Sequence, residues 1–333
     1  MGGSRQAFVI PPLNSGGLIT NYYCTSRCRH CLYASSPHWE KKYIDPETTE
    51  KALAKIKALG CRSVHIGGGE PFLNVEGLEM VAETADALGV DIEYVETNSS
   101  WYRHKDAACL VLSCLKAKGV PMVLVSMSPF HNEHIPFFKV KGIIEACKAV
   151  NMKVFPWISD FYGEIDAFDD TSTHTLEEYE SSYGSAYLKD LPSRYWIHFG
   201  GRALETFAPV LGTRPWQEIL SSNRGGCFEL LNVNHFHFDL FENYIPGLCS
   251  GLAIHRDDVG EEITEAKYPL LHTLFYKGIN GLFDLASSRY GFVPAETYMS
   301  KCHLCLDLRR YLVLHEGTAY LELKPRAFYE NVC

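Results

Sequence analysis

Short apolar runs alternate with helical patterns along the chain as far as about residue 200. The apolar runs predict five strands, GLITNYY (17–23), SVHI (63–66), VDIEYVETN (90–98), PMVLVS (121–126) and KVFPWI (153–158), and a sixth is expected over 194–199. Helical periodicity predicts helices over 48–59, 75–88, 106–118 and 138–150. Alternation at this spacing is typical of parallel strands joined by right-handed helical crossovers.

Composition and charge narrow the functional classes. The net charge of −9 and the lack of a Lys/Arg cluster argue against a nucleic-acid partner. No apolar run approaches the length of a membrane span, and the N-terminus lacks the apolar region of a signal peptide. Twelve cysteines without a secretory signal favour metal ligation over disulfides, and we expect a cytoplasmic location.

Three cysteines follow the first predicted strand in the run CTSRCRHC. Cys24, Cys28 and Cys31 have C-x3-C-x2-C spacing, and three thiolates this close can hold three corners of a cubane [4Fe–4S] cluster. The fourth iron then remains open to another ligand. The alternatives are a zinc knuckle or cysteines of a core turn, but zinc usually takes four ligands, and His30 lies between two cysteines.

A glycine-rich turn, GGGEP (67–71), follows the second predicted strand. Together with CTSRCRHC it resembles the radical S-adenosylmethionine (SAM) superfamily, over roughly residues 15–215. The resemblance implies that the open iron binds SAM and that Gly68, Gly69 and Glu70 contact its amino group. His30 stands where the family usually has an aromatic residue, and its ring is expected beside the adenine.

The resemblance also implies a fold and further site residues. We expect an α/β protein with a partial (β/α)6 TIM-type barrel over 1–215, interrupted by an insertion at 159–191. Asn98 is expected to face SAM or substrate, and Ser126 matches a serine that contacts the SAM ribose in relatives, although the accompanying Asp is Ser128 here. Arg202 lies in GGRA, similar to a turn common in relatives, and is a candidate for binding a substrate carboxylate.

The insertion 159–191 is acidic and rich in aromatic residues. Such a charged run is usually a solvated face, but a long segment at the mouth of a barrel is often a lid or a substrate-binding loop. The sequence is compatible with both interpretations, a solvated face and a lid or substrate-binding loop.

The remaining part, 216–333, carries a second set of cysteines. Cys302 and Cys305 form a C-x2-C pair, and Cys249 follows HFHFDLFENYIPGL, a strand–turn–strand pattern. This part resembles the SPASM and twitch extensions of radical SAM enzymes, which implies a small domain with one auxiliary [4Fe–4S] cluster on Cys227, Cys249, Cys302 and Cys305. A structural zinc ion on the same four residues is the alternative. Cys333 is the spare cysteine, either a surface thiol or a replacement ligand. His235 and His237 are expected to pack or to support ligands, not to bind a metal themselves.

The resemblance implies a reaction type. An external one-electron reductant of the flavodoxin or ferredoxin type would reduce the first cluster, and SAM would be cleaved to methionine and a 5′-deoxyadenosyl radical that abstracts a hydrogen from substrate. The expected outcome is oxidative modification of a peptide or protein side chain. The alternatives are a small-molecule dehydrogenase or rearrangement enzyme, and an iron–sulfur protein that only carries electrons.

Overall fold

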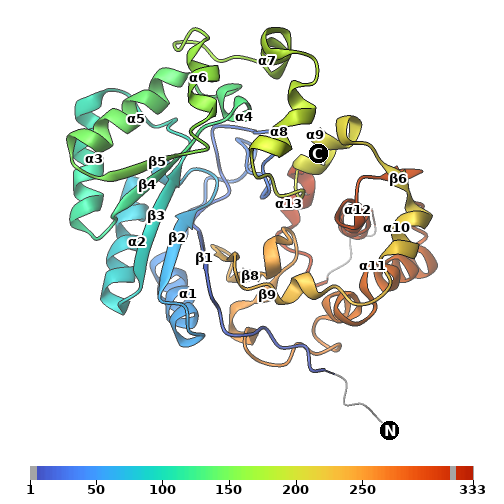
Figure 1. Ribbon diagram of the computed structural model, residues 1–333. Helices are drawn as coiled ribbons and strands as arrows, with labels where there is room; N and C mark the ends of the chain where they lie inside the picture. Colours follow the sequence, from blue (N-terminus) through green and yellow to red (C-terminus); the bar gives the residue numbers. More distant parts are fainter. Residues whose placement is uncertain (1–5, 316–319, 333) are drawn as a thin grey trace.

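The computed structural model describes residues 6–315 and 320–332. Its centre is an eight-stranded sheet in the order β5-β4-β3-β2-β1-β7-β8-β9 (Figure 1). The first five strands are parallel: β1 (Gly16–Ile19), β2 (Ser63–Gly67), β3 (Asp91–Thr97), β4 (Met122–Ser126) and β5 (Lys153–Trp157). The predictions of five parallel strands and of an α/β fold are therefore confirmed.

Helices follow these strands and cover one face of the sheet (Figure 1). They are α1 (Pro46–Ala58), α2 (Val75–Leu88), α3 (Lys105–Ala117) and α5 (Phe137–Ala149), with the short helices η1 (Pro71–Leu73) and α4 (Pro129–Asn132) between them. In α1, the apolar positions Ala52, Leu53 and Ile56 recur at helical spacing and are buried against the sheet. Asp45 caps this helix by accepting a hydrogen bond from the Thr48 amide.

The prediction of a sixth strand over 194–199 is wrong. Arg194 ends α8 (Tyr187–Arg194), and the following residues are irregular. Tyr195 and Ile197 are buried whereas Trp196 is exposed, which explains the strand-like pattern, but the segment pairs with no strand of the sheet. The sheet is consequently open, and the expected barrel closure is absent from the described residues.

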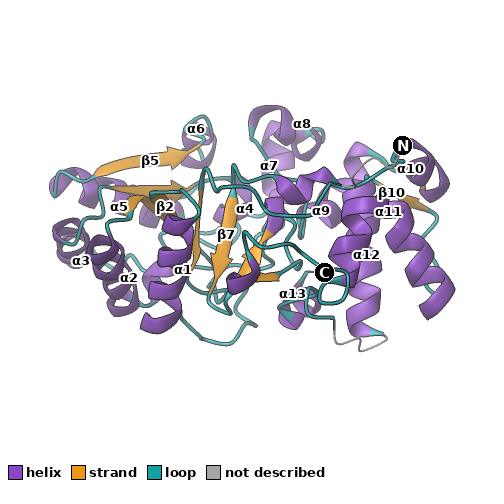
Figure 2. Ribbon diagram, turned by 90° about the horizontal axis from the view of Figure 1, so that it is seen from below, coloured by secondary structure: helices purple, strands orange, loops and turns teal. Residues whose placement is uncertain are grey.

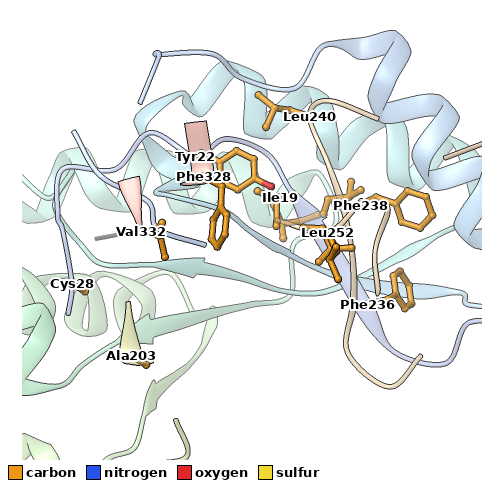
Figure 3. Close-up of a cluster of buried hydrophobic side chains, with 14 of the residues drawn as sticks. Ile19, Tyr22, Cys28, Ala203, Phe236, Phe238, Leu240, Leu252, Phe328 and Val332 are labelled. Atoms are coloured by element: carbon orange, nitrogen blue, oxygen red, sulfur yellow. The ribbon is translucent and has the colours of Figure 1, made fainter. Parts of the chain in front are cut away.

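The edge of β1 is instead occupied by a strand from the C-terminal part. In β7 (Phe236–Asp239), the chain runs parallel to β1, and β8 (Asn243–Ile245) and β9 (Ile254–His255) continue the sheet in antiparallel fashion. The predicted strand–turn–strand is thus confirmed, but its place beside β1 was not foreseen. Phe236 and Phe238 are fully buried and pack near Ile19 and Leu252 (Figure 3). Each such phenylalanine contributes about 1.5–3 kcal/mol by burial.

The insertion folds into the helices α6 (Phe161–Asp166), α7 (Leu176–Tyr183) and most of α8. Its acidic side chains are largely engaged within the fold: Glu164 pairs with Arg194, and both Asp166 and Asp170 pair with Lys141. The charge run therefore stabilises the insertion and is not simply a free anionic surface.

The rest of the C-terminal part is mainly helical. It comprises α9 (Ala203–Leu211), β6 (Arg214–Pro215), α10 (Trp216–Ser222), η2 (Phe228–Leu231), η3 (Pro246–Leu248), η4 (Arg256–Asp258), α11 (Pro269–Tyr290), β10 (Thr297–Tyr298), α12 (Lys301–Leu314) and α13 (Arg326–Asn331). Figure 2 shows α11 and α12 side by side, away from the parallel strands. Among the described residues, no helix combines the length and apolarity that crossing a bilayer requires.

Candidate active site

A cavity of about 250 Å³ lies at the carboxyl ends of the parallel strands. Its lining includes most of the residues predicted from the sequence, namely Cys24, Cys28, Cys31, His30, Gly68, Gly69, Asn98 and Ser126. They converge because β1 to β4 are parallel, so the loops that follow these strands meet at one edge of the sheet. Glu70 and Arg202 are not among the lining residues.

The three cysteines line this cavity together. Cys24 and Cys28 are buried, and Cys31 is half-buried. The sulfur of Cys24 accepts hydrogen bonds from the Ser26 amide at 3.4 Å and from Asn98 Nδ2 at 3.3 Å. Burial raises the pKa of Cys24 to about 12, and it also raises the pKa of Cys28 well above its ordinary value. Stable thiolates here therefore need a bound cation, and binding it would release protons.

Gly68 and Gly69 form a close backbone contact with the loop that leads to the cysteines. A Cβ atom on Gly69 would lie 2.1 Å from the carbonyl oxygen of Tyr23, and one on Gly68 would lie 2.6 Å from that of Asn21. Gly68 also has a positive φ of 147°, which disfavours other residues. The Gly69 amide donates to the Asn21 carbonyl at 2.7 Å. Glycine is required at both positions for the turn to approach the loop and the cavity.

Glu70 links the glycine turn to the end of β3. Its fully buried carboxylate accepts hydrogen bonds from the Asn98 amide at 2.6 Å, the Phe72 amide at 3.1 Å and the Thr97 hydroxyl at 3.0 Å. Burial raises the pKa of Glu70 to about 7, although these hydrogen bonds act to lower the pKa. The side chain therefore holds Asn98 in register with the glycine turn.

His30 has an unsatisfied nitrogen next to the cavity. Its ring stacks on Phe130 with centroids 4.7 Å apart, and its Nε2 lies 3.3 Å from the Tyr195 hydroxyl. The buried Nδ1 has no hydrogen-bond partner among the described residues. A buried polar atom of this kind usually marks the place of a ligand or a bound water.

Arg202 supports the cysteine loop from beneath. It is buried, and its guanidinium donates to the carbonyl oxygens of Cys28 at 2.9 Å, Ser35 at 2.7 Å and Asn331 at 3.3 Å. These contacts use three of the five N–H donors of the guanidinium, and all three go to backbone carbonyls. The structure thus gives Arg202 a different environment from the one expected from its motif.

The cavity is also lined by residues that were not predicted from the sequence, above all Glu96 and Tyr94 of β3. Burial raises the pKa of Glu96 to about 7. Residues 94, 96 and 98 alternate on one face of an extended strand, so the position of Asn98 was a usable signal for the other two.

A second cavity of about 460 Å³ lies in the C-terminal part and is lined by Cys227, Cys249, Cys302 and Cys305. The last two lie three residues apart on α12 and therefore share a helix face. Burial raises the pKa of Cys302 to about 11 and that of Cys249 well above its ordinary value, and in both the other cysteines add to the effect. Cys333 lies outside the described residues.

The two cavities share a wall. Trp196, Ile197 and His198 line the first cavity, whereas His198, Phe199 and Gly200 line the second. The segment expected as a sixth strand is therefore the partition between two cysteine-lined spaces.

The donor chemistry fits the groups that the sequence implied. Three thiols that line one cavity, a glycine turn without room for Cβ atoms, and the His30 Nδ1 without a partner among the described residues suit an iron–sulfur cluster with a small polar ligand.

Comparison with known proteins agrees with this reading of the first cavity. Residues 18–162 match the Radical SAM superfamily profile. A GTP 3′,8-cyclase from Chlorobaculum tepidum is 31% identical over 75 residues, which is 22% of this chain and 22% of that protein.

Two solved structures are also similar. Native anSMEcpe with bound AdoMet shares 18% identity over 51% of this chain and 49% of that chain, with a TM-score of 0.35. BtrN in complex with AdoMet and 2-DOIA shares 13% identity over 80% of this chain and 89% of that chain, with a TM-score of 0.42. The chain thus spans about a fifth of the curated relative and about half of anSMEcpe. Residues 18–162 are thus similar to the Radical SAM superfamily, a match that covers less than half of this chain.

Proposed function

We propose that the protein is a radical SAM enzyme that oxidises a substrate bound in the first cavity, beside the wall that this cavity shares with the second. Cys24, Cys28 and Cys31 would hold the first [4Fe–4S] cluster. When bound and reduced by an external flavodoxin- or ferredoxin-type donor, this cluster supplies the electron that cleaves SAM to methionine and a 5′-deoxyadenosyl radical.

The residues around the first cavity would then bind and orient SAM. The backbone of Gly68 and Gly69 would receive its amino group, and His30, Asn98 and Ser126 line the remaining wall. Glu70 and Arg202 would act as positioning residues, because their side chains hold the glycine turn and the cysteine loop.

The shared wall at His198 is the observation that carries the oxidative outcome. After hydrogen abstraction, a substrate radical must lose one more electron to become an oxidised product. An auxiliary [4Fe–4S] cluster on Cys227, Cys249, Cys302 and Cys305 would supply an acceptor for it across this wall.

A peptide or protein side chain is the first candidate substrate. The insertion helices lie beside the cysteine loop, where Glu177 of α7 pairs with Arg29, and they offer a folded surface along which a peptide could lie.

A small alcohol is the second candidate, and Glu96 favours it. A carboxylate in the cavity would accept the hydroxyl proton while the substrate radical loses its electron and becomes a carbonyl compound. The abstracted hydrogen leaves in 5′-deoxyadenosine, so one C–H and one O–H bond break and one C=O bond forms.

The proposed SAM chemistry is tested by anaerobic incubation of the reconstituted protein with SAM and dithionite. We expect release of 5′-deoxyadenosine, measured by liquid chromatography and mass spectrometry. A protein with its full iron content that releases none would be an electron carrier instead.

Replacing Gly69 by Ala should destabilise the protein and weaken SAM binding, because the added Cβ would meet the Tyr23 carbonyl at 2.1 Å. Overpacking of this kind costs about 1–3 kcal/mol. Urea unfolding and equilibrium dialysis with SAM would measure both effects. Gly163→Ala is the matched control, since a Cβ there has no heavy atom within 4 Å among the described residues. Equal SAM affinity in the two variants would contradict the proposed cradle.

Glu96 should make stability depend on pH. Because burial raises its pKa from 4.5 to about 7, the folded state binds this proton more tightly than the unfolded state. Its contribution is therefore fully present below about pH 4.5 and is lost as the pH rises through 7. As the pH rises from 5.5 to 8, the unfolding free energy of Glu96→Gln should increase by about 1–3 kcal/mol relative to that of the wild type. Parallel pH curves for the two proteins in urea unfolding would refute the shift.

A further inference from the structure

Three histidines meet on the inner face of the sheet. His65 lies on β2, His237 on β7, and His235 immediately before β7. One ring nitrogen from each lies within 4.8 Å of the other two, and the two Nε2 atoms of His65 and His237 are 2.9 Å apart. The sequence pattern had suggested packing for His235 and His237 and had not singled out His65.

Gly17 makes this meeting possible. β1 lies between β2 and β7, and Gly17 pairs in register with both His65 and His237. Strands two places apart in a sheet are about 9.5 Å apart, so the two rings meet only by reaching over β1. A Cβ atom on Gly17 would lie 2.7 Å from His65 Nε2. A side chain there would displace the rings.

Neighbouring aromatic groups fix the orientation of the rings. The Tyr33 hydroxyl lies 2.7 Å from His237 Nδ1, and His65 stacks on Tyr94 with centroids 5.2 Å apart. If Nδ1 of His237 carries the proton and donates to Tyr33, its Nε2 lone pair faces His65. This is the arrangement of a metal-ligating histidine whose outer nitrogen is held by a second residue.

A simple chain of hydrogen bonds would explain the contact between His65 and His237, but it does not require His235 to converge on the same point.

We propose that His65, His235 and His237 bind one divalent metal ion of the Zn²⁺ type. Three protein ligands leave a coordination position open, as in catalytic zinc sites. His235 is the member of the set that lines the first cavity, so the open position would face the proposed substrate. The matching substrate group is an oxygen ligand, either a carboxylate or a hydroxyl.

The test uses the reconstituted protein with its cysteine sites filled. The protein is exposed anaerobically to excess Zn²⁺, desalted, and analysed for zinc and iron by mass spectrometry. We expect about one retained zinc with unchanged cluster iron, because imidazole sites bind Zn²⁺ more tightly than Fe²⁺. X-ray absorption at the zinc edge should show nitrogen at about 2.0–2.1 Å, not sulfur at about 2.3 Å.

Variants locate the site. His65→Gln and His237→Gln should lose the zinc, whereas His272→Gln on α11, which pairs with Glu265, should retain it. Tyr33→Phe keeps all three ligands and should weaken zinc binding by about 10- to 100-fold. Because it removes one hydroxyl, it tests the site even if the histidine variants fail to fold. Three results would overturn the proposal. The wild-type protein could retain no zinc, the retained zinc could be coordinated by sulfur, or Tyr33→Phe and the histidine variants could bind zinc as tightly as wild type. None of these outcomes depends on SAM cleavage.

Discussion

Replacing Cys24, Cys28 and Cys31 together by Ala should remove about four of about eight iron atoms and abolish release of 5′-deoxyadenosine. The three thiols line one cavity at the carboxyl ends of the strands, and the C-terminal cysteines line a different cavity and cannot take their place. Iron analysis and mass spectrometry of the SAM products measure both effects. Loss of the cluster should remove SAM cleavage completely, because the residues that remain supply no electron.

The matched control is the triple variant Cys61→Ala, Cys109→Ala and Cys114→Ala. These cysteines belong to the same part of the chain but line neither cavity. The control should keep its iron and its SAM cleavage. Continued 5′-deoxyadenosine formation by the Cys24, Cys28 and Cys31 variant would refute the assignment of the first cavity.

Replacing Cys227, Cys249, Cys302 and Cys305 together by Ala should remove the other half of the iron but leave uncoupled SAM cleavage in place. These four residues come from three separate segments and line one cavity, where the buried Arg309 lies among them and donates to the Ser250 carbonyl at 2.8 Å. Its positive charge would partly offset the negative charge of a thiolate-bound cluster. Iron content and 5′-deoxyadenosine release, measured on the same preparation, separate the two cavities.

Two outcomes would change this assignment. In the first, the wild-type protein contains about four iron atoms and one tightly bound zinc, and mutation of these cysteines removes the zinc. This result would mean that the second cavity holds structural zinc. Cys333→Ala is the control and should leave iron and SAM cleavage nearly unchanged. Loss of about half the iron in that variant would make Cys333 a ligand, and intact clusters with lost turnover would make it a hydrogen donor to the substrate radical.

The outcome of the second prediction also bears on the substrate. If the auxiliary cluster is present and its loss stops product formation without stopping SAM cleavage, the reaction is an oxidation that needs an electron acceptor beyond His198. The acidic insertion does not decide between a peptide and a small alcohol, because Asp166, Asp170 and Glu164 are engaged by Lys141 and Arg194 within the fold. If the proposals for Glu96 and the histidine cluster hold, these residues would distinguish substrates by their oxygen groups.

The features that could be predicted from the sequence are those that depend on the local pattern of apolar and polar residues. Five strands and their helices follow from period-2 and period-3.6 spacing of apolar residues, and the cysteine run and the glycine turn lie just beyond strand ends. Because parallel strands end at one edge, convergence of Cys24, Gly69 and Asn98 on one cavity could be expected without coordinates.

Other features depended on which segments become neighbours in space. Alternation at 194–199 resembled a strand, but a strand needs a hydrogen-bonding partner, and this segment pairs with neither edge strand of the sheet, β5 or β9. Glu70 and Arg202 were recognised by motif, yet their roles follow from the backbone groups that surround them. Composition does not reveal such contacts, because the partners lie far away in the chain.

The histidine cluster illustrates the physical reason. His65 and His237 are 172 positions apart, and nothing in the local pattern of either strand relates them. They meet because β1 lies between their strands and carries Gly17 at the register of both histidines. Since Gly17 has no side chain, the two rings have room to meet over β1. Strand register and pairing are properties of the folded sheet, and they decide which polar side chains share one site.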